Sequence, residues 1–193
     1  MTFICISTFG QSISYNFSVD RTYRTLKAND FDGSQNFINF EDSITYPSIF
    51  YTTGFNWQKP ISKSTIFSVG VLIAKTGYQT IKLEREPEVE IKYYTFTIKR
   101  EYLNLPISVK WQISKNKIQT FLITGISTNI FLNSNHYTTI KYNDDSIESK
   151  INKSSRSGNF FNISLLLGAG IIMPINDIYQ IQINPVFRRS ITK

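Results

Sequence analysis

Few side chains in this sequence have the types and spacing that catalysis requires. His136 is the single histidine of the chain. An acyltransferase or protease would pair such a histidine with a carboxylate and a hydroxyl, and Asp144 and Asp145 are candidates for the carboxylate by proximity in sequence alone. A solvated loop histidine is the simpler interpretation, so we predict no catalytic residue.

Two other patterns could bind ligands, and both have simpler interpretations. The carboxylates of Glu84, Glu86, Glu88 and Glu90 alternate along the chain, so an extended segment would align them as oxygen ligands for a divalent cation. A solvated rim of charge is the commoner outcome of such a row. The segment 168–170 reads Gly-Ala-Gly, but it lacks the third glycine and the helix pattern of a phosphate loop. We therefore predict no metal and no cofactor.

The elements that must position these residues are β-strands. Aromatic residues make up 15% of the chain and charged residues only 18%, below the roughly 25% charge of an ordinary soluble domain. No stretch approaches the roughly 18 consecutive apolar residues of a membrane helix. Instead, apolar and polar residues alternate with period two in seven runs, at 12–24, 48–58, 64–75, 103–113, 118–132, 161–173 and 178–189.

Long charged connections at 25–46, 84–101 and 133–158 separate runs that are otherwise joined by short turns, such as 59–63 and 114–117. This layout predicts an all-β fold, an antiparallel up-and-down transmembrane β-barrel of about eight strands. Seven strands are clear in this chain, and open sheet edges are not viable in lipid. We therefore expect that a C-terminal strand is missing from the sequence.

The length of 193 residues suits one domain. We assign residues 1–11 to the remnant of a secretory signal peptide, because an apolar stretch there ends near a small residue, and residues 12–193 to the barrel. The alternative is that residues 2–9 form an ordinary strand. A net charge of +7 suits nucleic acid, anionic lipid or lipopolysaccharide. The positive residues are scattered along the chain, so we expect no nucleic-acid partner.

The apolar face of the runs is predicted to contact lipid, and the polar face to line the lumen. Trp57, Trp111 and Tyr179 take the apolar face beside short turns, as an interfacial aromatic belt would. The predicted lipid-facing residues are Ile49, Tyr51, Phe55, Trp57, Leu103, Leu105, Ile107, Val109, Trp111, Ile163, Leu165, Leu167, Ile171, Ile181 and Ile183. The predicted lumen residues are Asn56, Gln58, Ser108, Lys110, Gln112, Asn162, Ser164, Gln180, Gln182 and Arg188.

The facing of the fifth run is open, because Phe121 and Ile123 compete with Leu122 and Ile126 for the apolar face. Periodicity also does not tell which face is wet, so a soluble β-sandwich or lipocalin-like barrel is an alternative fold. An eight-stranded barrel is only wide enough for its own side chains. We therefore predict a plugged interior, in which the paired glycines near 168–170 relieve crowding.

Alternation resumes at Tyr93, ahead of the fourth run, but the parity of the apolar residues changes at Leu103. Tyr94, Phe96 and Ile98 occupy even positions, whereas the apolar residues from Leu103 onward occupy odd positions. A β-bulge near Tyr102, or an extension of the strands above the membrane, would account for this change.

Three segments resemble a known family. The segment YLNLPISVKWQISKNKIQTFLITGIS resembles the central hairpin of the PorT-like outer-membrane β-barrel proteins of Bacteroidota. The segment TIFSVGVLIAKTGYQTIK resembles the preceding strand of that family, and NISLLLGAGIIMPINDIYQIQINPVFRRSITK resembles its Gly-x-Gly strand and the strand after it. The likeness covers most of residues 48–193. It implies eight strands, the last ending on an aromatic residue, and a proline tolerated at Pro106; it does not explain Pro185.

These observations predict a non-enzymatic outer-membrane barrel that anchors external loops for interaction. Outer-membrane lipid and lipopolysaccharide are the expected surroundings, and the resemblance implies secretion or envelope proteins as partners. Two alternatives are a lipid-modifying barrel enzyme that uses His136 and a soluble ligand-binding barrel.

Overall fold

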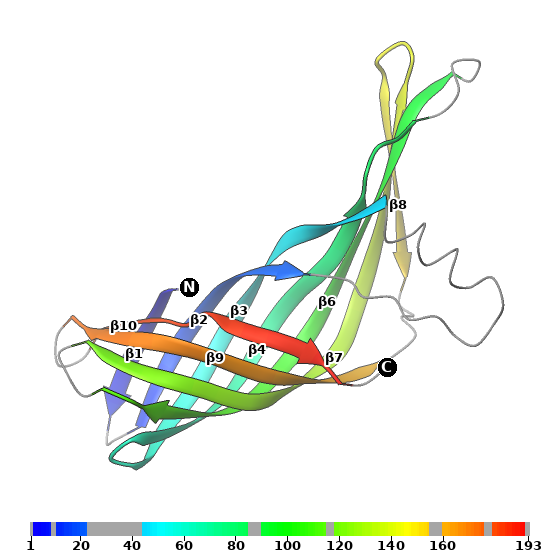
Figure 1. The fold of residues 1–193 in the computed structure, drawn as a ribbon. Helices are drawn as coiled ribbons and strands as arrows, with labels where there is room; N and C mark the ends of the chain where they lie inside the picture. The colour runs from blue at the N-terminus through cyan, green and yellow to red at the C-terminus, as the bar shows by residue number, and fades with distance from the viewer. Residues whose placement is uncertain are drawn as a thin grey trace.

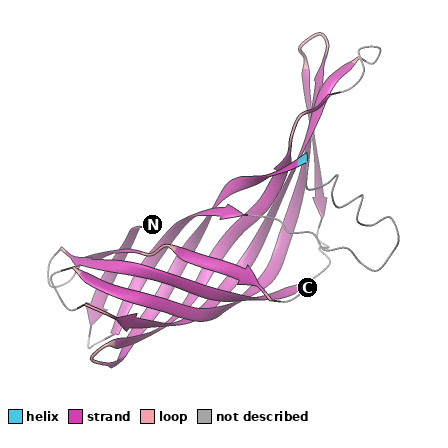
Figure 2. Ribbon diagram, viewed as in Figure 1, coloured by secondary structure: helices cyan, strands magenta, loops and turns pink. Residues whose placement is uncertain are grey.

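A computed structural model describes residues 2–8, 11–22, 44–84, 90–114, 118–154, 160–175 and 179–191. All of its elements are strands, and together they form one antiparallel sheet that curls around a common axis (Figures 1 and 2). The strands are β1 (Thr2–Thr8), β2 (Gln11–Thr22), β3 (Thr45–Ser62), β4 (Thr65–Thr80), β5 (Leu83–Glu84), β6 (Ile91–Gln112), β7 (Gln119–Tyr142), β8 (Ile147–Ser154), β9 (Phe161–Pro174), β10 (Gln180–Ile183) and β11 (Val186–Ser190).

The wall of the sheet follows the order β1-β2-β3-β4-β6-β7-β9-β10, so that neighbours in sequence are neighbours in space. The strand β11 pairs with β9 next to β10 and so continues the same edge of the sheet. The first strand, β1, contacts β10, so the two edges of the sheet lie close together. This arrangement confirms the predicted all-β, up-and-down fold.

The eighth strand of the wall is β1, which pairs with β2 from Thr2 opposite Phe17 to Thr8 opposite Gln11. This is the alternative that placed residues 2–9 in an ordinary strand. The described residues thus contribute eight strands to the wall, and the expectation of a further C-terminal strand stays a prediction. The assignment of residues 1–11 to a signal peptide concerns processing and stays a prediction.

Two of the predicted long connections contain strands. The described part of 84–101 includes the start of β6, and that of 133–158 includes the end of β7 and all of β8. These segments alternate Thr, Tyr and Ile with Lys and Asn, which favours strands but gives no continuous apolar face. The expected loop at 25–46 lies largely outside the described residues, although 45–46 begin β3.

These added lengths form the loop-side extension, which we define as residues 91–101 of β6, 133–142 of β7, and β8. The extension rises from the barrel end opposite the short turns (Figure 1). At its base, Glu101 pairs with Asn133 whereas Tyr102 pairs with Phe131, so one extra residue of β7 bulges there. The bulge and the extension together explain the parity change at Leu103, although the extra residue lies on β7 and not on β6.

Both prolines of the strand runs sit where a ladder is interrupted. Pro106 pairs with Ser127 on β7, while the ladder with β4 has a gap beside it. A Cβ on Gly70 would lie 3.0 Å from the Pro106 ring, so that glycine leaves room for the proline. Pro185 falls between β10 and β11 without a change of register along β9. A proline lacks the donor for a ladder bond, which explains the break.

The turn predicted at 59–63 is shorter in the structure. The strand β3 runs to Ser62, and Ser62 pairs with Thr65 across a two-residue turn at 63–64. The β3–β4 hairpin is thus a tight connection, as expected for the end of a barrel that lacks long loops.

Candidate functional site

The outer face of the wall is apolar and open to its surroundings. Ile49 is 74% exposed and Leu165 is 50% exposed. Of the predicted lipid-facing residues, the exposed ones are Ile49, Tyr51, Phe55, Trp57, Ile107, Trp111, Leu165, Leu167 and Ile183. The half-buried ones are Leu103, Leu105, Val109, Ile163, Ile171 and Ile181. A contiguous apolar surface of this extent is rare on soluble monomers, and we keep the prediction that it contacts lipid.

The structure assigns the two faces of β7, which the sequence left open. Leu122 and Ile126 lie on the outer face and are exposed, whereas Phe121 and Ile123 are buried inside. The two buried side chains form an apolar cluster with Ile172 of β9. Sequence periodicity missed this cluster, because aliphatic residues then occur on both faces of one strand.

The predicted lumen residues lie mostly on the inner face. Those buried are Gln58, Ser108, Lys110, Ser164 and Gln182. Those half-buried are Asn56, Gln112, Asn162 and Gln180. Arg188 lies opposite Leu166 in β11, where it is exposed.

Hydrogen bonds between strands connect the inward side chains. The amide of Asn104, which is 0% exposed, donates to Ser127 Oγ and, over 2.6 Å, to Asn129 Oδ1. The amide of Asn129 donates in turn to Ser164 Oγ at 3.1 Å. These bonds tie β6, β7 and β9 together across the interior and satisfy polar groups that burial would otherwise penalise.

Lys110 is the buried cation of the inner face, with 5% exposure. Its ammonium donates to Gln182 Oε1 at 3.2 Å and lies 5.5 Å from the centroid of the Phe121 ring. Glycines make room for such packing, because a Cβ on Gly170 would lie 2.5 Å from Phe121 Cζ and 2.3 Å from Asn184 Oδ1. This contact supports the interpretation of the 168–170 glycines as relief from crowding.

The candidate catalytic residues are not brought together. His136 lies within β7, opposite Ile98 and Asn152, and its Nε2 is 3.1 Å from Ser134 Oγ. Asp144 and Asp145 lie in the turn between β7 and β8. Eight or nine residues at about 3.3 Å each separate the imidazole from these carboxylates by roughly 25 Å, which is too far for a triad.

The row of glutamates is only partly described. Glu84 ends β5 and Glu90 is exposed before β6, while Glu86 and Glu88 lie outside the described residues. Within the described ranges, no group of three or more histidine, cysteine, aspartate or glutamate side chains could hold a metal ion.

No helix in those ranges is long and apolar enough to cross a membrane.

Lys75, Glu101 and Asn133 form a row of charged and polar side chains on the outer face, at the loop-side end of the apolar surface. We call it the charged row. Lys75 Nζ lies 3.1 Å from Glu101 Oε1, and the amide of Asn133 donates to Glu101 Oε2 at 2.8 Å. The Lys75 ammonium also lies 4.8 Å from the centroid of the Tyr51 ring. Charged side chains are costly in hydrocarbon, so this row marks the edge of the lipid core.

The tip of the extension is held by ion pairs. Lys141 Nζ lies 2.7 Å from Asp145 Oδ1, and Lys92 Nζ lies 3.7 Å from the same oxygen. The hydrogen bond and charge of Lys141 lower the pKa of the Asp145 carboxyl below its ordinary value of 3.8. The Tyr142 hydroxyl donates to Glu148 Oε2 at 2.7 Å across the turn and lowers the pKa of that carboxyl.

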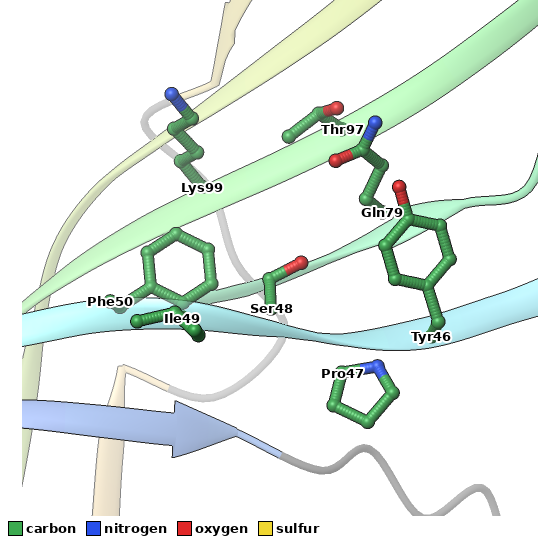
Figure 3. A pocket seen from close by; sticks show the side chains of 8 residues that line it. All are labelled: Tyr46, Pro47, Ser48, Ile49, Phe50, Gln79, Thr97 and Lys99. Carbon is green, nitrogen blue, oxygen red and sulfur yellow. The ribbon is translucent and has the colours of Figure 1, made fainter.

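A groove opens on the outer wall just beyond the charged row. Between the pairs Pro47–Tyr78 and Thr52–Ala74, β3 has one residue more than β4, and this bulge separates the strands. The groove has a volume of about 320 Å³, and we call it the bulge groove. Figure 3 shows its side chains, which include Tyr46, Ser48, Ile49, Gln79, Thr97 and Lys99.

A curled antiparallel sheet of up-and-down strands with an apolar outer face, a polar inner face and short turns at one end is typical of a transmembrane β-barrel. A family model described as outer membrane protein beta-barrel domain matches residues 9–189. The chain belongs to this family and is located in the bacterial outer membrane. Neither a curated protein nor a solved structure matches it.

Proposed function

We propose that this outer-membrane barrel is a non-enzymatic anchor whose loop-side extension binds a protein of the secretion or envelope machinery. The finer family assignment belongs to the same proposal: the segments quoted above resemble the PorT-like proteins of Bacteroidota, some of which act beside such machinery. Lipid and lipopolysaccharide are the other proposed partners, because they surround the barrel wall.

The observation that carries this proposal is the length of β6 and β7 relative to the membrane. The apolar outer residues of β6 run from Trp111 to Leu103, close to the roughly 9–11 residues that span a bilayer when tilted. The strand then continues to Ile91, and its partner β7 continues to Tyr142. Membrane insertion alone does not require these additional residues, which favours their use as a binding surface.

The side chains of the extension also suit protein contact better than catalysis. Ile147 and Ile151 of β8 are 65% and 55% exposed, and a strand with apolar side chains can add to or receive a partner strand. His136 lies far from Asp144 and Asp145, as shown above. The two carboxylates considered for the lipid-modifying alternative therefore lie too far from His136 to activate it.

Site-specific photocrosslinking in intact cells tests the proposal. A photoreactive residue placed at Ile151 should give one discrete adduct with an envelope protein, whereas the same residue at Ile183, on the membrane band, should give none. The Ile151 adduct should disappear when the partner's gene is deleted. Equal labelling from both positions, or no adduct from Ile151 in a correctly folded barrel, contradicts the proposal.

A further inference from the structure

We infer that the bulge groove binds the phosphorylated headgroup of an outer-leaflet glycolipid. This inference rests on the proposed function only in taking lipopolysaccharide as a partner; it adds the site and the residues that bind. Three properties of the groove carry it: its height relative to the membrane, its two-sided chemistry and a positive charge with which no carboxylate of the described residues pairs.

The height follows from the strands that line the groove. The row of Lys75 and Glu101 marks the edge of the lipid core. Gln79 lies four residues further along β4, and Lys99 two residues further along β6. At about 3.3 Å per residue on tilted strands, these side chains lie roughly 5–10 Å above that edge. The headgroup layer of a bilayer adds about 5–8 Å on each side of the hydrocarbon, so Lys99 lies at the level of the headgroups and Gln79 at their outer limit.

The chemistry of the groove changes from apolar to polar along the strands. Ile49 is exposed and faces the membrane side. The Tyr46 hydroxyl, the Gln79 amide and the Thr97 hydroxyl lie toward the other side (Figure 3). Gln79 stands directly opposite both Tyr46 and Thr97 in the two flanking ladders. Lys99 lies opposite Gly77, two residues nearer the membrane than Gln79. A glycolipid whose phosphate lies beside Lys99 and whose sugar hydroxyls lie beside these polar groups presents a matching order.

The Lys99 ammonium is the charged group of the groove, and its position would allow it to bind an anion. The Lys99 ammonium lies 4.9 Å from the centroid of the Tyr137 ring, and among the described residues no carboxylate pairs with it. In contrast, Glu101 neutralises Lys75 nearby. Lysines bind phosphate as point charges, so the Lys99 ammonium complements a phosphate and not a neutral sugar.

A second cation reinforces this charge. Lys99 pairs with Asn135 on β7, and Asn135 pairs with Lys153 on β8. Direct cross-strand partners share one face of a sheet, so Lys153 lies on the same outer face, about 10 Å from Lys99 across two strand spacings. The groove and its flank therefore present two ammonium groups toward the headgroup layer.

Lipid binding to the purified full-length chain, folded in detergent, tests this inference. The probes are lipid A carrying its phosphates, dephosphorylated lipid A and phosphatidylglycerol, and native mass spectrometry measures the bound fraction. We expect phosphorylated lipid A to bind best. Lys99→Gln should weaken its binding about fivefold, since a lysine near an anionic headgroup contributes on the order of 1 kcal/mol.

The matched control is Lys150→Gln. Lys150 pairs with Thr138 on the inner-facing side of the extension, so this variant removes the same charge from the other face and should bind as the wild type does. Thr97→Val serves as a second groove variant if Lys99→Gln does not fold. Unchanged affinity in the folded groove variants, an equal loss in Lys150→Gln, or equal binding of dephosphorylated lipid A or phosphatidylglycerol overturns the inference.

This test is independent of the protein partner proposed above. The crosslink from Ile151 reports a protein in intact cells, whereas the lipid measurement uses the isolated barrel. Failure of one measurement therefore leaves the other proposal standing.

Discussion

At the scale of single residues, depth in the membrane decides what a substitution does. Ile107 lies midway along the apolar residues of β6 and is 44% exposed, while Ile113 lies beyond Trp111 and is 67% exposed. The two residues are chemically identical and differ in their distance from the turn end. They therefore form a pair that separates the effect of depth from the effect of residue type.

Ile107→Arg should lower the free energy of unfolding by about 2–4 kcal/mol, because the guanidinium must enter hydrocarbon. Ile113→Arg should cost only about 0–1 kcal/mol, because its side chain reaches the interface. Reversible denaturant unfolding in phospholipid vesicles measures both values. Equal costs at the two positions would show that β6 does not cross the bilayer in the orientation described.

Residues on the inner face behave like a packed core. A Cβ on Gly125 would lie 2.2 Å from the Ile107 carbonyl oxygen and 2.8 Å from Ser108 Cα, so backbone would have to move. Gly125→Ala should lower the free energy of unfolding by about 1–3 kcal/mol, in the range of overpacking.

Thr124→Ala is the control for Gly125→Ala, since Thr124 is the neighbouring half-buried residue with the opposite facing on β7. It should change the free energy of unfolding by less than about 1 kcal/mol. Vesicle unfolding curves again provide the measurement. A Gly125→Ala barrel as stable as the wild type would mean that the strands can separate at this point without cost.

At the scale of elements, period-two alternation predicts strands well wherever one face is apolar. The runs that became β2, β3, β4, β6 and β9 follow this pattern, and their facing could be read from the residues. The extension could be predicted only in part. Tyr94, Phe96 and Ile98 indicated alternation along β6, whereas residues 133–142 and β8, in which Thr, Tyr, Lys and Asn alternate without a continuous apolar side, read as a connection. The facing of β7 could not be read from the sequence, because the inner cluster of Phe121, Ile123 and Ile172 places apolar residues on the inner face as well as on the outer face.

The candidate groove was also beyond the sequence. Tyr46 and Lys99 are more than fifty positions apart, and only the β3 bulge and the register of β4 bring them to one surface. A single extra residue in one strand leaves no mark in composition or alternation. The signal that could have pointed to it is the change of apolar parity between Tyr46 and Ile49.

The turn at the tip of the extension should respond to acid. Because Lys141 lowers the folded-state pKa of Asp145 below 3.8, this pair stabilises the turn at pH values above 3.8. The contribution is lost as the pH falls through the lower folded-state pKa. Below about pH 4, the amides of the turn, such as Tyr142 bonded to Ser146, should exchange faster with deuterium relative to their intrinsic rates.

Asp145→Asn provides the control for this pH dependence. Asp145 has a φ of 65°, a conformation that asparagine also tolerates, so the backbone of the turn should survive the substitution. The variant should exchange faster than the wild type at neutral pH and show little further change in acid. An unaltered acid response in Asp145→Asn would assign the effect to another carboxyl group, such as Glu148.

At the scale of the whole molecule, the filled interior predicts that the barrel conducts no ions. Asn104 and Ser127 are 0% exposed and Gln182 is 1% exposed, so water does not reach these side chains. In an eight-stranded barrel there is no wider path beside them. Planar bilayer recordings should show no steps in current from protein whose folding is verified by heat-modifiable migration; steps of defined size would contradict a filled lumen.

The unbroken pairing of β6 and β7 has a mechanical consequence. Their ladder runs from Ile91 opposite Tyr142 to Gln112 opposite Phe121, with only short irregularities. A force applied at the tip of the extension therefore acts along the backbones of β6 and β7. In the barrel wall, this force is distributed over many backbone hydrogen bonds of the ladder. We therefore expect the extension to transmit a pulling force from its tip to the barrel wall without bending at an intervening hinge.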